Sequence, residues 1–269
     1  MSAPSPVVKL TAKNALAGRW LPSAAVCTVL LLVYFTGDIL ASLISMPFGT
    51  TGYILFFALF TVFALFPLIL GATYYFRRLL WGSTDSALII FKFFSSVQLY
   101  KRAINLSLLL ALKLIAAAVV LFLPCLLVLL LSSEWLYAFF DMSLPIWASN
   151  MWVLNSFLVI FAVLALCFVM LKYYLSAFLL VCDENMTAAE AVNMSTIISK
   201  RSGANFVGLI MSFAPWILLS LLVAPLIFTL PYFIASYCVH CRFSIAEYNS
   251  DVDRFNASST PYFRADDIL

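Results

Sequence analysis

Few residues of this sequence could do chemistry, and the densest group is Cys238-Val239-His240-Cys241, which holds the only histidine of the chain. Two thiols three positions apart lie on one face of a helix, and thiolate and imidazole are both zinc ligands. A structural zinc site needs four ligands, however, and a thioredoxin-type redox pair belongs to a different fold. We therefore interpret Cys238, His240 and Cys241 as packing residues first and as weak metal candidates second. Cys182 is the one further thiol that could join them.

Two charged residues interrupt long apolar runs. Asp38 is the carboxylate of the first run, and an acid inside a membrane is a functional-site hypothesis by default, here as a proton or cation ligand. The alternative is that Asp38 lies toward the outer end of a long tilted helix, near water or an inter-helix partner. Lys113 is expected to extend toward the inner headgroups, because residues 114–131 are still long enough to cross a membrane.

No catalytic motif is visible. The sequence has no G-x-x-x-x-G-K-[ST] loop, no H-E-x-x-H helix and no G-x-S-x-G turn, and one histidine cannot supply a histidine-based cluster or relay. We predict that the protein is not an enzyme, with no catalytic residues and no cofactor. The basic residues are spread along apolar boundaries, which favours anionic lipid as their partner and not nucleic acid.

The composition excludes a water-soluble fold. Hydrophobic residues make up 65% of the 269 residues, charged residues make up 10%, and the mean hydropathy is +1.07. A soluble domain of this composition would expose large apolar patches, whereas about 18 apolar residues cross a ~30 Å hydrocarbon core as a helix. We predict an all-α polytopic membrane protein with one transmembrane domain over residues 1–249 and a polar cytoplasmic tail over residues 250–269. Six spans are predicted, at about residues 21–46, 53–76, 104–131, 151–171, 205–230 and 231–248.

A short amphipathic segment precedes each pair of spans, at about residues 7–20, 86–100 and 187–200. Apolar residues at helical spacing beside basic residues are typical of a helix that lies in the membrane interface. The second and third segments follow an aromatic pair, Tyr74-Tyr75 or Tyr173-Tyr174, and an acidic turn. We therefore predict three repeats of a surface helix followed by a transmembrane hairpin. The predicted interfacial anchors are Arg19, Trp20, Arg77, Arg78, Lys101, Arg102, Lys200 and Arg201.

The positions of Lys and Arg predict the orientation. The first, third and fifth loops between the predicted spans contain neither residue, while the N-terminal segment, the other two loops and the tail do. The positive-inside rule then places both termini in the cytoplasm and makes the aromatic-rich segment 132–150 an outer loop. We expect a multi-pass plasma-membrane protein whose cytoplasmic face contacts anionic headgroups. Another membrane protein or a second copy of the chain is a further expected partner.

One set of residues, most of them from Tyr173 onward, carries a resemblance to a known family. These residues are Tyr173-Tyr174-Leu175-Ser176, Asp183, Ala188 to Ala191 with Glu190, Ser195, Ser212-Phe213-Ala214-Pro215-Trp216 with Leu218 and Leu219, and Pro231-Tyr232, together with the opening Lys9-Leu10, Ala12, Asn14-Ala15-Leu16 and Gly18. In these residues the sequence resembles the DUF975 family of bacterial integral membrane proteins of unknown function. The family usually has a glycine before the tryptophan, where this chain has Ala214-Pro215, and a Lys-Gly near the end of the surface helix, where it has Lys200-Arg201. The resemblance implies a bacterial membrane fold and brings no known activity.

These observations favour a non-catalytic bacterial inner-membrane protein that acts as an accessory, scaffold or membrane-organising component. The alternative is a small transporter or channel subunit in which Asp38 is an intramembrane ion or proton group. In that case Pro124 or Pro215 would permit a helix break near a pathway. Two internal charges are few for a coupled transporter, so the scaffold hypothesis comes first.

Overall fold

The computed structural model describes residues 5–83, 86–132, 151–219 and 223–259. In this part the chain is all-helical, with 89% helix and no strand. Among the described residues, five helical segments are long and apolar enough to cross a membrane: Trp20–Ile44, Gly49–Leu80, Val97–Leu131, Met151–Met170 and Leu226–Asp251. The all-α prediction is therefore confirmed, and these lengths and compositions are consistent with a multi-pass membrane protein. The predicted outer loop falls on residues 133–150, which lie outside the described part of the chain.

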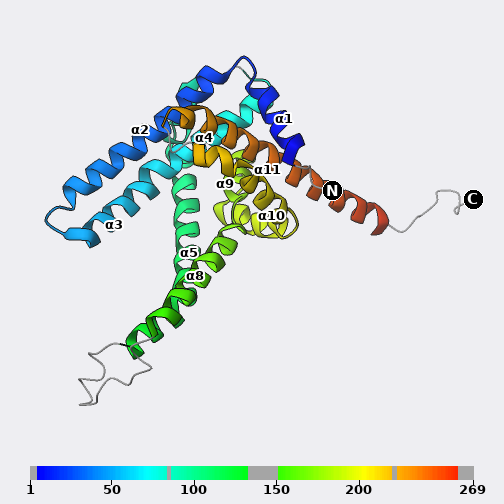
Figure 1. Ribbon diagram of the computed structural model, residues 1–269. Helices are drawn as coiled ribbons and strands as arrows, with labels where there is room; N and C mark the ends of the chain where they lie inside the picture. Colours follow the sequence, from blue (N-terminus) through cyan, green and yellow to red (C-terminus); the bar gives the residue numbers. More distant parts are fainter. Residues whose placement is uncertain (1–4, 84–85, 133–150, 220–222, 260–269) are drawn as a thin grey trace, which may run out of the picture.

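Two apolar hairpins leave a packed centre in different directions (Figure 1). The first hairpin consists of α2 (Trp20–Ile44), α3 (Gly49–Phe60) and the π-helical turn η1 (Thr61–Leu65). The second consists of α5 (Val97–Leu131) and α8 (Met151–Met170). We call the centre the hub; it contains α1 (Ser5–Leu16), α4 (Phe66–Leu80), the 3-10 helix η2 (Ala87–Phe94), α9 (Ser176–Cys182), α10 (Ala188–Leu219) and α11 (Val223–Ser259). The first turns of α2 and α5 also pack into the hub.

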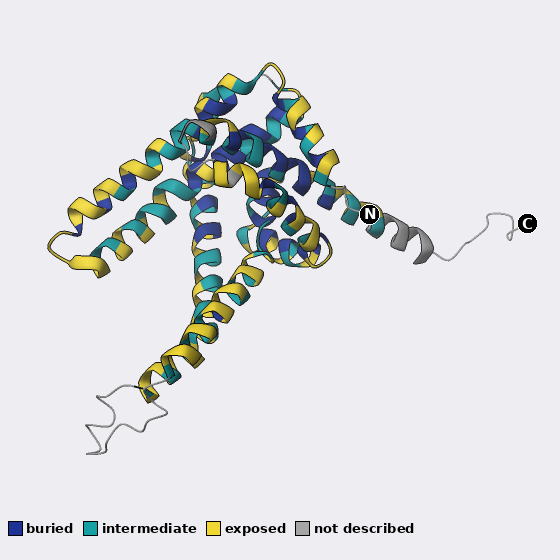
Figure 2. Ribbon diagram, viewed as in Figure 1, coloured by how far each residue is buried: buried dark blue, intermediate teal, exposed yellow. Residues whose placement is uncertain are grey.

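The buried core lies in the hub, whereas the hairpins are mostly exposed (Figure 2). Phe76 of α4, Phe178 of α9 and Phe213 of α10 are almost completely buried. Of the most apolar stretch in each span, 44% is buried in α11 but only 6% in α5 and 6% in α8. The hairpins therefore keep large apolar side chains, such as Leu126 and Phe161, on their outer surface.

The N-terminal helix α1 is an element of the hub. Its Val8, Ala12 and Leu16 are spaced four apart and are all buried, so the apolar face predicted from the sequence packs on protein. The helix ends at Leu16, four residues earlier than the predicted boundary at residue 20. Gly18 has a φ of +74°, a left-handed conformation that glycine adopts without a Cβ clash, and it allows the chain to turn into α2.

A proline shapes the junction between the first hairpin and the hub. Pro67 has no N–H to donate to the carbonyl four residues earlier, which belongs to Phe63 in the π-helical turn. The hydroxyl of Tyr100, at the start of α5, donates to this carbonyl at 3.0 Å. The second hairpin is thereby tied to the first at its base, where both enter the hub.

The second predicted surface helix, residues 86–100, is not one α-helix. The structure has the 3-10 helix η2 over residues 87–94, an interruption at Ser95 and Ser96, and the first turn of α5 from Val97. The tighter helix fits because η2 lies directly against α4: a Cβ on Gly71 would overlap the carbonyl oxygen of Ile90. A short 3-10 helix whose backbone packs against Gly71 therefore stands where the periodicity predicts a separate amphipathic α-helix.

The third predicted unit also differs from its expected boundaries. The helix α10 begins at Ala188, near the predicted start, but it continues through Lys200 and Arg201 to Leu219. The predicted fifth span, residues 205–230, is consequently divided, because α11 begins at Val223. Pro231 lies inside α11 and does not start a new span. Proline is tolerated within membrane helices, so it is a weak boundary signal there. The predicted tail is helical to Ser259, and its remainder lies outside the described residues.

Candidate functional site

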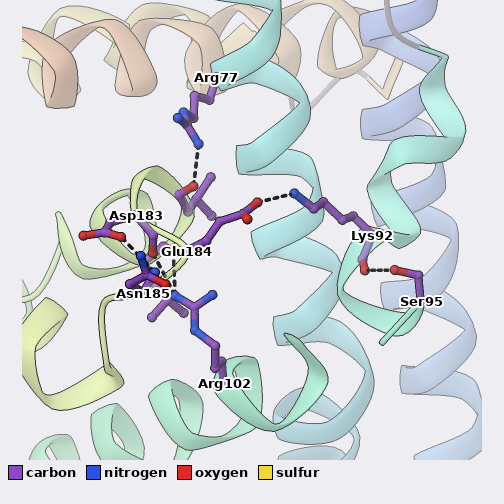
Figure 3. A network of polar contacts seen from close by, with 9 residues as sticks. Arg77, Lys92, Ser95, Arg102, Asp183, Glu184 and Asn185 are labelled. Atoms are coloured by element: carbon purple, nitrogen blue, oxygen red, sulfur yellow. Dashed lines mark hydrogen bonds and ion pairs between the residues drawn. The ribbon is translucent and has the colours of Figure 1, made fainter. Parts of the chain in front are cut away.

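Cations from three elements of the chain converge on the turn between α9 and α10 (Figure 3). Arg77 of α4 donates through Nη1 to the carbonyl of Val181 at 2.6 Å. Arg102 of α5 donates through Nη2 to the carbonyls of Asp183 and Met186 at 2.8 and 2.9 Å. This turn, residues 183–187, therefore connects the third unit of the chain to the bases of both hairpins.

The end of α9 and the turn after it attract cations because their carbonyls are left without intrahelical partners. The last carbonyls of a helix have no intrahelical partner, and the guanidinium group presents several donors to them. The backbone N–H of Asn185 donates to Oδ1 of Asp183 at 2.8 Å, which fixes the turn locally. Lys92 of η2 pairs with Glu184 at 2.9 Å and lowers the pKa of that carboxyl group.

The start of α10 is closed by a capping box. The backbone N–H of Thr187 donates to Oε2 of Glu190 at 2.8 Å, and the N–H of Glu190 donates to Oγ1 of Thr187 at 3.3 Å. The two side chains thus satisfy two of the N–H groups that a helix N-terminus leaves unpaired. The same hydrogen bonds lower the pKa of Glu190. The acidic side chains of the predicted turn and helix start therefore stabilise the connection between α9 and α10.

The predicted interfacial anchors lie around the hub, and several of them contact the chain itself. Arg19 donates to the carbonyls of Ser83 and Gly82 at 2.5 and 3.3 Å, and Trp20 contacts the ring of Tyr232. The guanidinium of Arg78 lies over the ring of Tyr74. Arg77 and Arg102 bind the end of α9 and the turn described above. Arg201 pairs with Asp251, whereas Lys101 and Lys200 are exposed. Binding of anionic headgroups by these residues stays a prediction.

His240 is buried among aromatic residues of the hub. Its Nε2 lies 3.1 Å from the hydroxyl of Tyr174, which is also 2.8 Å from Oγ of Ser202. The ring of Phe206 stacks on Tyr174 and also contacts the ring of His240, with ring centroids 4.1 and 5.5 Å apart, and the Tyr174 and His240 rings are 5.9 Å apart. Burial raises the pKa of the Tyr174 hydroxyl. The histidine therefore acts as one member of a small hydrogen-bonded network that joins α10 and α11.

The cysteines near His240 are packed in the same core. Cys238 and Cys241 are fully buried, and Cys182 at the end of α9 is half-buried. Burial raises the pKa of the Cys182 thiol to about 11, which keeps it protonated at neutral pH. Within the residues that the structure describes, no group of three or more His, Cys, Asp or Glu side chains is arranged to hold a metal ion.

The two intramembrane charges lie in different hairpins. Asp38 is half-buried on α2 and accepts a hydrogen bond from the hydroxyl of Tyr53 on α3 at 2.5 Å. Lys113 is half-buried on α5, with residues 114–131 still ahead of it before the tip of the second hairpin. Asp38 thus has the inter-helix partner that the sequence left as one of two alternatives, and that partner belongs to its own hairpin.

The residues that carry the family resemblance meet α1. Lys9 donates to the carbonyl of Ser212 at 2.7 Å and lies over the ring of Phe213, 4.3 Å from its centroid. The hydroxyl of Tyr232 donates to the carbonyl of Lys9 at 3.4 Å. Pro231 is buried inside α11, while Trp216 is half-exposed on α10. Burial of Lys9 lowers the pKa of its ammonium group. The N-terminal helix is therefore fastened to α10 and α11 through this motif.

Sequence reasoning named Ser195 only as a residue of the family resemblance and did not identify the hydroxyl groups of the hub as a set. Ser195 and Ser199 both donate to the carbonyl of Lys172, at 2.9 and 3.1 Å, and Ser202 follows on the same side of α10. Their spacing of four and three is the available signal, because such residues share one helix face. Serines are common in membrane helices, so this spacing alone did not distinguish them.

No family model, curated protein or solved structure matches this chain. The resemblance to the DUF975 family stays a prediction.

Proposed function

We propose that this chain is a non-catalytic multi-pass protein of the bacterial plasma membrane that organises other membrane components. The observation that carries the proposal is the contrast between a hub whose polar groups bind one another and two hairpins whose apolar side chains are left exposed. A rigid hub of this kind holds the hairpins apart, and each hairpin offers its surface to lipid and to a transmembrane segment of a partner protein.

The polar groups of the hub support a structural role. Arg77 and Arg102 bind backbone carbonyls, Lys92 binds Glu184, and His240 binds Tyr174. Each of these groups has a partner that fixes the position of one helix relative to another. An arrangement in which the strongest donors hold the fold together supports a scaffold better than a site for chemistry.

The collection of basic residues at the hub supports one orientation. Arg19 and Arg102 lie beside the first turns of α2 and α5 at the hub, and Arg77 and Lys200 lie in α4 and α10 of the hub, so the positive-inside rule favours a hub on the cytoplasmic side of the membrane. Both termini would then be cytoplasmic, and residues 133–150 would face outward. A single cysteine introduced at 140 in a cysteine-free variant should react with a membrane-impermeant reagent from outside; reaction only from inside would reverse the orientation.

The alternative is a small transporter or channel subunit that uses Asp38. The hydrogen bond between Asp38 and Tyr53 favours it, because a paired acid inside an apolar hairpin is the kind of group that ion pathways employ. Proteoliposomes that contain the wild type and the Asp38→Asn variant separate the two proposals. The scaffold predicts no flux above empty vesicles for either protein, whereas flux that Asp38→Asn abolishes would establish the alternative.

A direct test of the scaffold uses photo-crosslinking in the native membrane. A photoreactive residue at position 126 or 161, on the exposed faces of α5 and α8, should yield lipid adducts and a discrete membrane-protein adduct. The same residue at position 178, in the core of the hub, should crosslink only within the chain. A hairpin that gives lipid adducts alone at both positions would contradict the partner-binding part of the proposal.

A further inference from the structure

A groove of about 350 Å³ lies between α10 and α11, on the outer side of the Tyr174 and His240 network. Its walls are one face of residues 197–202 on α10 and one face of residues 244–251 on α11, so it runs along a short part of each helix. Its lining residues are Ile197, Ile198, Arg201, Ser202, Ser244, Glu247, Tyr248 and Asp251. Neither the charge pattern nor the apolar periodicity of the sequence indicated it, because its two walls are some forty residues apart in the chain.

The groove carries charges of both signs. Arg201 of α10 and Asp251 of α11 form an ion pair that joins its two walls, and their side chains are 68% and 32% exposed. Glu247 lies one helical turn before Asp251 on the same side of α11. One cation therefore lies beside two carboxylates within a single concave surface, and the guanidinium remains largely accessible from outside.

The floor of the groove is fixed and partly apolar. The hydroxyl of Ser202 donates to the carbonyl of Ile198 at 3.1 Å and contacts Tyr174, while Ser244 lies 3.5 Å from His240. These contacts hold the floor to the core of the hub. Ile197, Ile198 and Tyr248 supply the apolar part of the lining. The arrangement suits a ligand that has a polar head and an apolar body.

The position of the groove indicates where such a ligand would come from. Its α11 wall is the last part of the candidate span Leu226–Asp251, the end that carries the charged residues. Charged residues at the end of a span lie at headgroup level. A lipid headgroup could therefore enter the groove from the bilayer.

From this arrangement of one cation beside two carboxylates, we infer that the groove binds a ligand that carries both a phosphate group and a primary ammonium, as phosphoethanolamine does. Arg201 would bind the phosphate through its planar set of donors, and Glu247 and Asp251 would accept hydrogen bonds from the ammonium. A glycerol phosphate headgroup lacks the ammonium and would bring its negative charge against both carboxylates. A quaternary ammonium carries no N–H and could not make these hydrogen bonds.

The experiment measures thermal stabilisation of the purified full-length protein in detergent. The ligands are dihexanoyl phosphatidylethanolamine, dihexanoyl phosphatidylglycerol and free phosphoethanolamine, each titrated over the same concentration range. A ligand that binds only the folded state raises the melting temperature in proportion to its occupancy. We expect phosphatidylethanolamine to raise it and phosphatidylglycerol to leave it unchanged. Stabilisation by free phosphoethanolamine as well would identify the soluble headgroup as sufficient.

The variants are Arg201→Gln and Glu247→Gln, with Lys200→Gln as the matched control because Lys200 is an exposed neighbour outside the groove. Loss of one charge-assisted contact should weaken the apparent affinity of Arg201→Gln by about tenfold or more, and that of Lys200→Gln by less than about twofold. The melting temperature without ligand shows whether each variant folds. If Arg201→Gln does not fold, Glu247→Gln tests the site in its place. Equal stabilisation by the two lipids, equal affinity of wild type and both variants, or no stabilisation by either ethanolamine compound would overturn the inference. None of these results bears on the scaffold function.

Discussion

The hub and the two hairpins differ in how far their apolar side chains are buried and in where their polar side chains find partners. In the hub, Phe76, Phe178 and Phe213 are buried together, and the charged residues around them bind backbone carbonyls or one another. In the hairpins, residues such as Leu126 and Phe161 remain outside, and the polar pair Asp38 and Tyr53 is closed within one hairpin. The difference indicates that the hub folds on its own contacts, whereas the hairpins depend on their surroundings for burial.

The largest expected difference between the two regions comes from deleting one aromatic side chain in each. Phe178→Ala removes a fully buried ring from the hub and should lower the free energy of unfolding in detergent by about 3–5 kcal/mol. Phe161→Ala removes a ring that is 71% exposed on α8 and should change it by less than about 0.5 kcal/mol. Denaturant titration of both variants would measure the free energy of unfolding. Similar decreases for the two variants would contradict the claim that the buried core lies in the hub and not in the hairpins.

A second pair of variants tests the close contact between α4 and η2. Gly71→Ala places a Cβ against the carbonyl of Ile90 and should destabilise the protein by about 3 kcal/mol, because a backbone atom cannot rotate away. Gly203→Ala in α10 has open space around the new Cβ and should be stabilising by up to about 1 kcal/mol. A melting temperature that Gly71→Ala leaves unchanged or raises would show that η2 does not lie against Gly71.

The turn between α9 and α10 gives a third test. Arg102→Ala leaves the carbonyls of Asp183 and Met186 without this donor and should cost about 2 kcal/mol of stability. Lys101→Ala removes an exposed neighbouring charge and should have an effect below about 0.5 kcal/mol. If the two variants unfold at the same denaturant concentration, Arg102 is a surface anchor and does not tie the hub together.

The smallest expected effect is a dependence of stability on acidic pH. The pKa values of Glu184 and Glu190 are lowered in the folded protein from an ordinary value of 4.5, by Lys92 and by the capping box respectively. Their contribution is therefore present above about pH 4.5 and is lost as the pH falls through the lowered values. Melting temperatures recorded between pH 6 and pH 3 should fall less steeply for Glu190→Gln than for wild type; parallel curves would show that the capping box does not form.

The sequence predicted those features that depend on local pattern. Runs of apolar residues predicted the ends of α2 and α8 with errors of two residues or fewer. The spacing of Val8, Ala12, Ala15 and Leu16 predicted an amphipathic helix, and the structure buries Val8, Ala12 and Leu16 of that apolar side against protein. Thr187 and Glu190 also mark a helix start by a rule that acts over three residues. Local physics is sufficient in each of these cases.

The features that the sequence did not predict depend on contacts between distant segments. Arg102 follows a predicted surface helix, yet it lies inside α5, and its side chain binds carbonyls some eighty residues later in the chain. Nothing in the sequence around Gly71 indicates its contact with the backbone of Ile90. The sequence around Ser202 likewise does not indicate its contact with Tyr174. Lys200 and Arg201 were misread as a helix end for a similar reason: charged residues stop a membrane span but need not stop the helix that carries it.

The central claim is that the hub holds the two hairpins apart, and the distance between their tips tests it most directly. Spin labels at Met46→Cys and Leu131→Cys, two exposed positions near the ends of α2 and α5, would be introduced into a cysteine-free variant in lipid nanodiscs. Double electron–electron resonance should give a distance between the two labels far above the ~10 Å that separates the axes of packed helices. A short distance with a narrow distribution would show that the hairpins close into one bundle and would contradict the scaffold.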